Sequence, residues 1–422
     1  MKENRLLAVI ALCLMTTVAV NAENLFSSLL GKSEEEVNQR LEMLWQHFFT
    51  PGDVSVFDAE GQKTVYYETA DNMAFIYDTG SNDVRSEGMS YGMMISVQTN
   101  HRAEFDKLWR WAKRYMAYPK NTPWDGYFCW QCSRDGKQIG NSNASDGELY
   151  FATALFLAAE RWNEPQYAEE ANEILEKCMS KTGEGGVYNL YNRDNYLITF
   201  VPDKVGKEFS DPSYQLPAFL DKWAEVATND RKFWKKAAKA ARQHLIDSAD
   251  PVTGLYPDYS NYDGSAYRWP HAGYDTSIYM YDAIRCAMNV GMDYYLWGKD
   301  KKRQTAVMSR LLSFFKSDNY KHARFSLDGK KRFDNYTHGM LGANAVAAFA
   351  LAKSSAEHKE LAKEQLQRLW DSQPPTGKYR YYDGMVYYLS WLHVAGSFSL
   401  YFNKNKWWPR KSLRGHHILN NN

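Results

Sequence analysis

The sequence predicts an all-α protein built as an (α/α)6 double barrel, a toroid of about twelve helices. Apolar residues recur at helical spacing in about twelve segments, whereas no long run alternates apolar and polar residues as a sheet would. The segments also alternate between two compositions, one apolar nearly all round and one charged on a single face. No linker rich in Pro, Gly or Ser divides the 422 residues, so we expect one domain.

The first residues are expected to lie outside this fold. Lys2 and Arg5 precede an apolar run that ends in small residues near Ala22, which is typical of a secretory signal peptide. The run is too short and wrongly flanked for a stable membrane anchor. We therefore expect a signal peptide at 1–22, a single domain at 23–422, and an exported monomer, periplasmic or extracellular, that is not held in a membrane.

The expected helices differ in a regular order. They span residues 33–48, 86–100, 103–117, 145–162, 167–179, 213–227, 230–247, 273–294, 301–316, 338–353, 355–371 and 383–402. The odd-numbered ones from the third to the eleventh have one charged face, as in Arg231 to Arg242, which is typical of a half-exposed helix. The even-numbered ones, such as Phe151 to Ala159, are apolar or small nearly all round, which indicates burial on all sides. Six buried helices therefore form an inner ring within six outer helices, and short hairpins are expected near 65–77 and 187–199.

Polar and acidic residues gather where the inner helices are expected to begin. These clusters are Arg85 to Gly88, Ala144 to Glu148, Ser210 to Tyr214, Trp269 to His271, Thr337-His338 and Tyr381 to Gly384. Any one has a structural explanation, since Ser145 or Asp211 could be an ordinary N-cap. Six at alternating helix starts point instead to one shared site. Asp282 lies within an expected helix in an apolar context, where a carboxylate needs a partner, and Arg285 is the natural one.

Two carboxylates across a groove lined with aromatic residues favour cleavage of a glycosidic bond. One carboxyl must be protonated to donate to the leaving oxygen, and the other must be ionised to activate water or to attack the sugar. The chain is 15% aromatic, with 30 Tyr, 20 Phe and 14 Trp, which suits flat polar ligands such as sugars, although an aromatic-rich core would also explain it. The near-neutral net charge of +1 argues against a nucleic-acid partner.

Neither a cofactor nor a metal is expected. The sequence has no HExxH, no compact histidine spacing, no Walker loop, no GxGxxG after a strand and no GxSxG. Cys129 and Cys132 have CxxC spacing, but no second ligand pair follows them, so a zinc site is not expected. These two cysteines could form a local disulfide or remain thiols, and we assign them no catalytic role.

Four segments resemble glycoside hydrolase family 8. Residues 86–93 are similar to its SEGxxYGM segment, and 144–152 are similar to its ASDGDxxxA segment. Residues 211–214 resemble its DPSY segment and 281–285 its YDAxR segment, and the four occur in the family's order. The resemblance implies an (α/α)6 fold and an inverting hydrolase. Glu148 and Phe151 depart from the usual residues, which puts the subfamily in doubt more than the chemistry.

The resemblance also implies roles for individual residues. Glu87 matches the general acid, and Asp282 matches the general base that activates water. Asp146 matches the acid that binds and distorts the central sugar. Tyr214 matches the tyrosine that helps hold the water, and Arg285 the arginine that supports the base. Inversion requires that the two catalytic carboxyls lie roughly 6.5–9.5 Å apart to leave room for the water.

Within this family the spacing from the acid to the base and on to His338 looks most like that of exo-oligoxylanases, which release xylose from the reducing end. That resemblance implies that His338 contacts the reducing-end sugar, although His338 could also simply begin a helix. Trp124, Tyr382 and Trp130 are the candidates for stacking on sugars, and Trp124 could instead pack a loop onto the barrel rim. The implied partner is therefore a xylo-oligosaccharide.

Three other functions stay open from the sequence. The first is an endo-acting xylanase or β-glucanase with an open groove. The second is a polysaccharide lyase or unsaturated-glycoside hydrolase on the same barrel, which would usually need several basic residues in the groove. The third is a non-catalytic glycan-binding protein, which gains nothing from an acid and a base on opposite sides of the bond.

Overall fold

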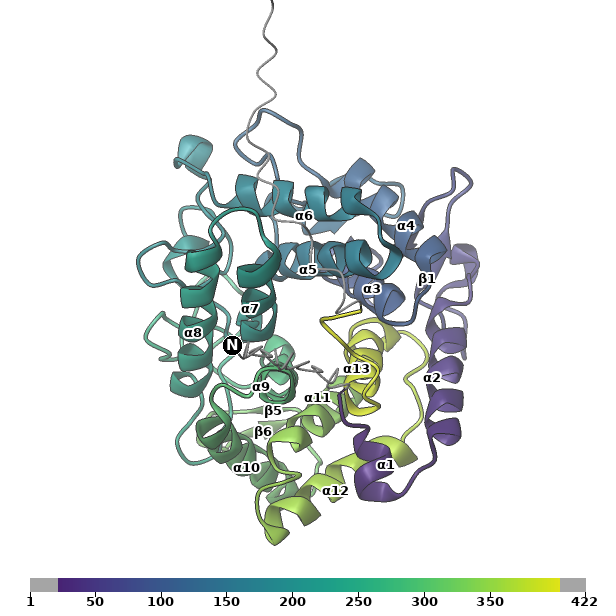
Figure 1. Cartoon of the computed structure of the whole chain (residues 1–422), viewed down its shortest axis with the longest axis vertical. Helices are drawn as coiled ribbons and strands as arrows, with labels where there is room; N and C mark the ends of the chain where they lie inside the picture. The colour runs from purple at the N-terminus through teal and green to yellow at the C-terminus, as the bar shows by residue number, and fades with distance from the viewer. Residues whose placement is uncertain (1–21, 403–422) are drawn as a thin grey trace, which may run out of the picture.

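The computed structural model describes residues 22–402, and these form a double ring of helices (Figure 1). The predicted signal peptide lies outside the described residues except for Ala22. Within residues 22–402, no helix is both long and apolar enough to cross a membrane. The predicted all-α (α/α)6 class is confirmed.

Six helices form the inner ring. They are α3 (Ser86–Gln98), α5 (Ser145–Trp162), α7 (Pro217–Val226), α9 (Arg285–Leu296), α11 (His338–Ala347) and α13 (Arg380–Val394). Each contacts the next in this order, and α13 contacts α3, so the ring closes. Most of their residues are buried, as the apolar composition of the even-numbered segments predicts.

Six longer or more polar helices surround this ring. They are α2 (Glu34–Phe49), α4 (Arg102–Trp111), α6 (Pro165–Cys178), α8 (Arg231–Asp247), α10 (Lys301–Ser317) and α12 (Ala356–Asp371). Among these outer helices, α4, α6, α8, α10 and α12 each pack on the inner helix that precedes them in the chain, and α2 packs on α13. A short helix that the periodicity did not indicate, α1 (Leu25–Leu30), lies against α12. Local signals set several starts, such as the capping box of Ser33 and Glu36 at α2.

Two inner helices begin later than the sequence indicates. The expected helix 273–294 is a loop as far as Met280, then a 3-10 turn, η6 (Tyr281–Ile284), and only then α9. Tyr281 has φ 32°, a value that an α-helix cannot contain. The expected helix 213–227 is likewise a 3-10 turn, η5 (Pro212–Tyr214), followed by α7 with Pro217 in its first turn. Asp282 therefore lies in a turn before a helix, and its expected place inside a helix is wrong.

The other helix ends lie closer to the ends that the sequence predicts. A π-helical turn, Ala112–Met116, follows α4, and a 3-10 turn, η7 (Ala348–Ala350), follows α11. Helix α13 ends at Val394 rather than 402, because the chain turns at Gly396, which has φ 72°.

The described strands are short and lie in the connections. Strand β1 (Tyr66–Glu68) pairs antiparallel with β2 (Ala74–Ile76), which confirms the first predicted hairpin. The region 187–199 has only an isolated bridge between Tyr191 and Ile198, so the second hairpin is not formed as strands. The remaining pairs are β3 (Val84–Arg85) with β4 (Gln131–Cys132), and β5 (Arg324–Phe325) with β6 (Arg332–Phe333). The pairing of β3 with β4 fixes the chain just before Glu87.

Helices α9 and α11 approach each other closely at Gly291. A Cβ at Gly291 would lie 2.3 Å from the carbonyl oxygen of Val346. Neither backbone can move without displacing the closed inner ring, so a glycine is required there by close approach.

We expect Gly291→Ala to lower the free energy of unfolding by about 1–3 kcal/mol, the usual cost of overpacking. Urea denaturation followed by circular dichroism measures this change. Lys302→Ala, at an exposed position of α10, is the control and should change stability by less than about 0.5 kcal/mol. Equal stability of Gly291→Ala and the wild type would contradict close packing at this crossing.

Candidate active site

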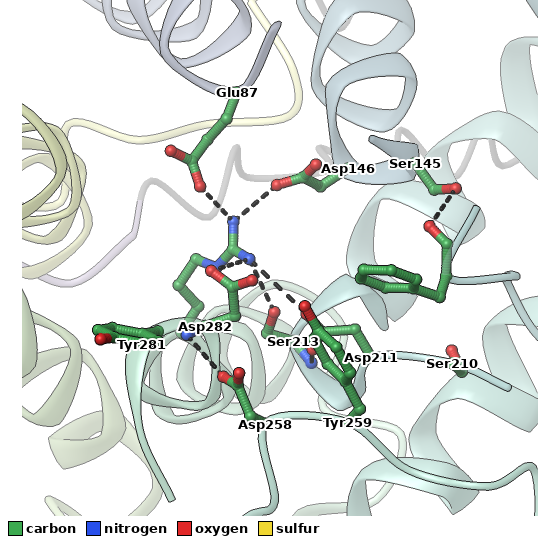
Figure 2. Close-up of polar contacts among 12 residues, drawn as sticks. Glu87, Ser145, Asp146, Ser210, Asp211, Ser213, Asp258, Tyr259, Tyr281 and Asp282 are labelled. Carbon is green, nitrogen blue, oxygen red and sulfur yellow. Dashed lines mark hydrogen bonds and ion pairs between the residues drawn. The ribbon is translucent and has the colours of Figure 1, made fainter. Parts of the chain in front are cut away.

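The starts of the inner helices bring the predicted site residues together at one end of the barrel. Glu87 is the second residue of α3, Asp146 the second of α5, and Arg285 the first of α9. Asp282 lies in η6, just before α9. Figure 2 shows Glu87 and Asp146 on one side of this cluster and Asp211, Asp258 and Asp282 on the other.

The Arg285 guanidinium lies at the centre of these acids. Nη1 donates to Glu87 Oε2 at 3.0 Å and to Asp146 Oδ2 at 2.7 Å. Nη2 lies 2.9 Å from Asp282 Oδ1 and 4.0 Å from Asp211 Oδ2. The contact between Asp282 and Arg285 confirms the pairing that their spacing predicts. Glu87 and Asp282 thus contact different amino groups of the same guanidinium.

One buried cation cannot balance this many acids. The Arg285 side chain is only 2% exposed, and Asp146 and Asp211 are 4% and 0% exposed. Burial raises the pKa of Glu87 to about 8, even though Arg285 acts in the opposite direction. Burial likewise raises the pKa of Asp146, and it raises the pKa of Asp211 well above its usual range. The site therefore holds Glu87 as a protonated carboxyl at neutral pH.

Two further groups that contact this cluster were not among the predicted site residues. The Tyr381 hydroxyl donates to Glu87 Oε1 at 2.9 Å, and the Tyr91 hydroxyl accepts from Arg285 Nη1 at 2.6 Å. Tyr381 can approach because residue 88 is glycine, since a Cβ there would lie 2.4 Å from the Tyr381 ring. Both tyrosines lie within segments that the sequence singles out, but their side-chain directions were not predictable from it.

Asp258 is a third group that the sequence did not indicate. Its Oδ1 accepts the backbone N–H of Asp282 at 3.0 Å. Burial and then the nearby Asp282 raise its pKa well above its usual range. Asp258 lies in the connection between α8 and η6, without a surrounding pattern that marks it as part of the site.

Two predicted aromatic residues lie beside Arg285. The guanidinium carbon is 5.6 Å from the Tyr214 ring centre and 5.9 Å from that of Tyr382. Tyr214 is 4% exposed. The Tyr382 hydroxyl donates to the Tyr281 carbonyl oxygen at 3.0 Å, so this side chain also holds the turn that carries Asp282.

The other predicted side chains lie at different distances from the cluster. His338 is the first residue of α11, which packs against η6. Trp130 lies with its ring centre 5.5 Å from the Arg85 guanidinium, next to the start of α3. Trp124 packs on Tyr118 and Tyr127 in its own loop, and among the described residues none of its ring contacts involves the Arg285 cluster. Its contacts match the loop-packing interpretation.

The two possible N-caps also differ. Asp211 is a cap, because its carboxylate accepts the backbone N–H of Ser213 at 2.6 Å. Ser145 is not, since Ala144 occupies the cap position of α5 and the Ser145 hydroxyl donates to the Phe200 carbonyl at 2.9 Å. The capping explanation is therefore wrong for Ser145 and incomplete for Asp211, whose carboxylate also faces Arg285.

Glu148 is buried away from Arg285 and supports the loop before α5. Its carboxylate accepts the Phe128 backbone N–H at 2.9 Å and the Asn143 side-chain amide at 2.8 Å. Burial raises its pKa to about 8. Residue 148, where the family's segment usually has aspartate, therefore supports this loop rather than the Arg285 cluster.

The chemistry of the cluster is that of carboxyl groups. Among residues 22–402, no group of three or more His, Cys, Asp or Glu side chains is arranged to hold a metal ion. Cys129 and Cys132 are buried free thiols, as are Cys178 and Cys286. The cluster thus contains two carboxyl groups, Glu87 and Asp282, that contact the same guanidinium.

Comparison with known proteins supports the same interpretation. Residues 65–394 match the family described as glycosyl hydrolases family 8. Reducing-end xylose-releasing exo-oligoxylanase Rex8A of Paenibacillus barcinonensis is 36% identical over 379 residues, which cover 88% of this chain and 94% of that protein. The solved structure of Rex8A complexed with xylose has a TM-score of 0.82 at 36% identity and covers 91% of this chain and 98% of that one. A family 8 xylobiose complex from Teredinibacter turnerae has a TM-score of 0.82 at 40% identity, covering 90% and 98%.

The raised pKa of Glu148 makes stability depend on pH. The unfolded carboxyl titrates near pH 4.3, whereas the folded one titrates at about 8. Between these values the folded state holds a proton that the unfolded state lacks, so stability falls as pH rises, by up to about 1.4 kcal/mol per unit. We expect Glu148→Gln to lose less stability than the wild type between pH 5 and pH 8 in urea titrations. Glu357→Gln, at an exposed position, should follow the wild type, and a Glu148→Gln curve parallel to the wild type would contradict the raised pKa.

Proposed function

The chain belongs to glycosyl hydrolases family 8, and from this premise we propose that it hydrolyses β-1,4-linked xylo-oligosaccharides with inversion and releases xylose from the reducing end. The observation that carries the proposal is the placement of Glu87 and Asp282 on opposite amino groups of Arg285. The choice of substrate is supported by relatives named reducing-end xylose-releasing exo-oligoxylanases, which match this chain over nearly its whole length.

In this proposal the geometry separates the two proton transfers. Glu87, held protonated by burial, donates its proton to the glycosidic oxygen as the bond from that oxygen to the anomeric carbon breaks. Asp282 accepts a proton from a water molecule that attacks the anomeric carbon from the opposite face. The products are a shortened sugar of inverted configuration and a free sugar, with the proton of the water left on Asp282.

Arg285 serves both groups in this mechanism. It contacts Asp282, the proposed base, and lowers the pKa of Glu87 from the value that burial alone would give. Asp146, which shares Nη1 of Arg285 with Glu87, would bind the central sugar, and Tyr214 beside the guanidinium would help to hold the water. Water rather than an enzyme carboxylate is the attacking group in this inverting mechanism.

Release of xylose from the reducing end requires recognition of that end. We propose that His338 supplies this contact, because α11 begins beside the turn that carries Asp282. Tyr382 and Trp130 are the aromatic side chains near the cluster that would pack on sugars. We further propose that the protein is exported, on the strength of its leader-like N-terminal sequence, and that it acts as a monomer.

Product analysis from xylotriose tests the substrate and the catalytic roles together. The wild type should yield xylose and xylobiose and leave polymeric xylan almost intact. Asp282→Asn should reduce turnover by at least about 1,000-fold while retaining folding and binding, because the water loses its base. Glu87→Gln should be impaired far more on xylotriose than on an aryl xylobioside, whose good leaving group needs no proton.

Other results would count against parts of this proposal. Random cleavage of xylan or glucan would identify an endo-acting enzyme with the same chemistry. Near-normal turnover by Asp282→Asn would remove the catalytic assignment itself. Binding without turnover by the wild type would favour a non-catalytic glycan-binding protein.

The rate should fall at alkaline pH as Glu87 loses its proton. Because the pKa of Glu87 is raised to about 8, kcat/KM should fall about tenfold per pH unit above that value. The negative charge of Asp146 contributes to the raised pKa of Glu87. Asp146→Asn should therefore move the alkaline fall of kcat/KM to lower pH. Asp125→Asn is the control, because its carboxylate pairs with Lys177 rather than with Arg285, and it should leave the alkaline fall of kcat/KM in place. If kcat/KM of Asp146→Asn fell at the same pH as that of the wild type, electrostatic coupling between Asp146 and Glu87 would be contradicted.

A further inference from the structure

The peptide bond between Tyr281 and Asp282 is held at both edges by side chains. The Tyr382 hydroxyl donates to its carbonyl oxygen at 3.0 Å, and Asp258 Oδ1 accepts its N–H at 3.0 Å. Asp258 comes from the connection after α8, whereas Tyr382 is the third residue of α13. Two distant parts of the chain therefore fix one peptide plane, and that plane leads into Asp282.

This backbone needs outside support. Tyr281 has φ 32°, which is a sparsely populated conformation for a bulky aromatic residue, and its side chain is 53% exposed. An exposed ring gains little from packing in return for this conformation. Such conformations persist when surrounding contacts determine them, and they gather at functional sites. Because Asp282 is the next residue, the direction of its carboxylate follows from the plane of this peptide.

Among the described residues, the hydrogen-bond partners of the Asp258 side chain are confined to the backbone at Asp282 and Ala283. It is 0% exposed, and its Oδ2 is buried without a hydrogen bond among the described residues. No ion pair of Asp258 is found in residues 22–402, and the nearby charged groups that act on it are Asp282 and Asp211. Burial of a carboxyl group without an ion-pair partner costs free energy, so an apolar residue would be expected at this position unless a carboxyl oxygen made a necessary contact. Its direct backbone contact with Asp282 supplies one.

We propose that Asp258 is a positioning residue for the catalytic base, forming with the Tyr382 hydroxyl a clamp on the Tyr281–Asp282 peptide that aims the Asp282 carboxylate at the attacking water. The proposal rests on the proposed function, in which Asp282 is the base. Burial and the neighbouring acids raise the pKa of Asp258, which favours its neutral form. What the clamp requires is then an acceptor oxygen rather than a negative charge.

Two substitutions of Asp258 separate the acceptor from the charge. Asp258→Asn keeps an oxygen that can accept the Asp282 N–H and should retain kcat on xylotriose within about threefold. Asp258→Ala removes it, so kcat should fall about 100-fold, as expected for a misplaced catalytic group. KM should change less than about threefold, because Asp258 contacts Asp282 and not the sugar. Asp250→Ala is the matched control in the same connection, since its carboxylate caps a turn at Val252 and Thr253, and it should leave kcat unchanged.

The other half of the clamp gives an independent test that does not depend on the folding of Asp258→Ala. Tyr382→Phe keeps the ring and removes only the hydroxyl, and it should lower kcat about tenfold with KM nearly constant. Because both groups hold one peptide, the effects should be non-additive, so that Asp258→Ala costs less in the Tyr382→Phe background than in the wild type.

Several results would overturn the clamp. They are an Asp258→Asn variant as slow as Asp258→Ala, full kcat in Asp258→Ala or in Tyr382→Phe, or losses that appear in KM alone. Activity of Asp282→Asn distinguishes failure of the clamp from failure of the proposed function. If Asp282→Asn is inactive while Asp258→Ala retains full kcat, only the clamp is wrong. If Asp282→Asn is active, the assignment of the base is wrong.

Discussion

A single buried guanidinium organises this end of the barrel. Arg285 contacts Glu87 from α3, Asp146 from α5 and Asp282 from η6, and it faces Asp211 beside η5. These groups come from four of the six inner-ring positions. Because a buried charge must be paired, the inner helices have to meet with their N-terminal ends at the same level. The closed ring and the site therefore depend on each other.

The same constraint sets the protonation of the acids. One positive charge cannot neutralise four carboxylates in a water-poor environment, so some of them keep their protons. Glu87 is only partly compensated by Arg285, and burial leaves it protonated near neutral pH. Asp282 is the more exposed of the pair, with a side chain 25% exposed against 15% for Glu87. The two carboxyl groups therefore have different surroundings, which is what the proposed division of roles between them requires.

The sequence predicted the fold well where periodicity and burial agree. Helix α5 begins and ends where expected, because Ser145 to Trp162 is a long, nearly continuous apolar segment ending at Asn163 with φ 55°. The prediction failed at η6, because the residues around Asp282 have helical spacing although Tyr281 has a backbone that no α-helix contains. The structure also removes an alternative that the sequence left open, an N-cap at Ser145, whose hydroxyl has a partner in a distant loop.

Local patterns by themselves determined the alternation of inner and outer helices, the acidic helix starts and the family. These features depend on composition and spacing along one segment, which are visible in a linear chain. Only the tertiary structure decided that Asp258, Tyr381 and Tyr91 belong to the site. Their contacts join residues 24, 294 and 194 positions apart, and such contacts follow from how the ring closes rather than from any local preference. It also decided which carboxyl holds a proton, because burial is a property of the packed barrel.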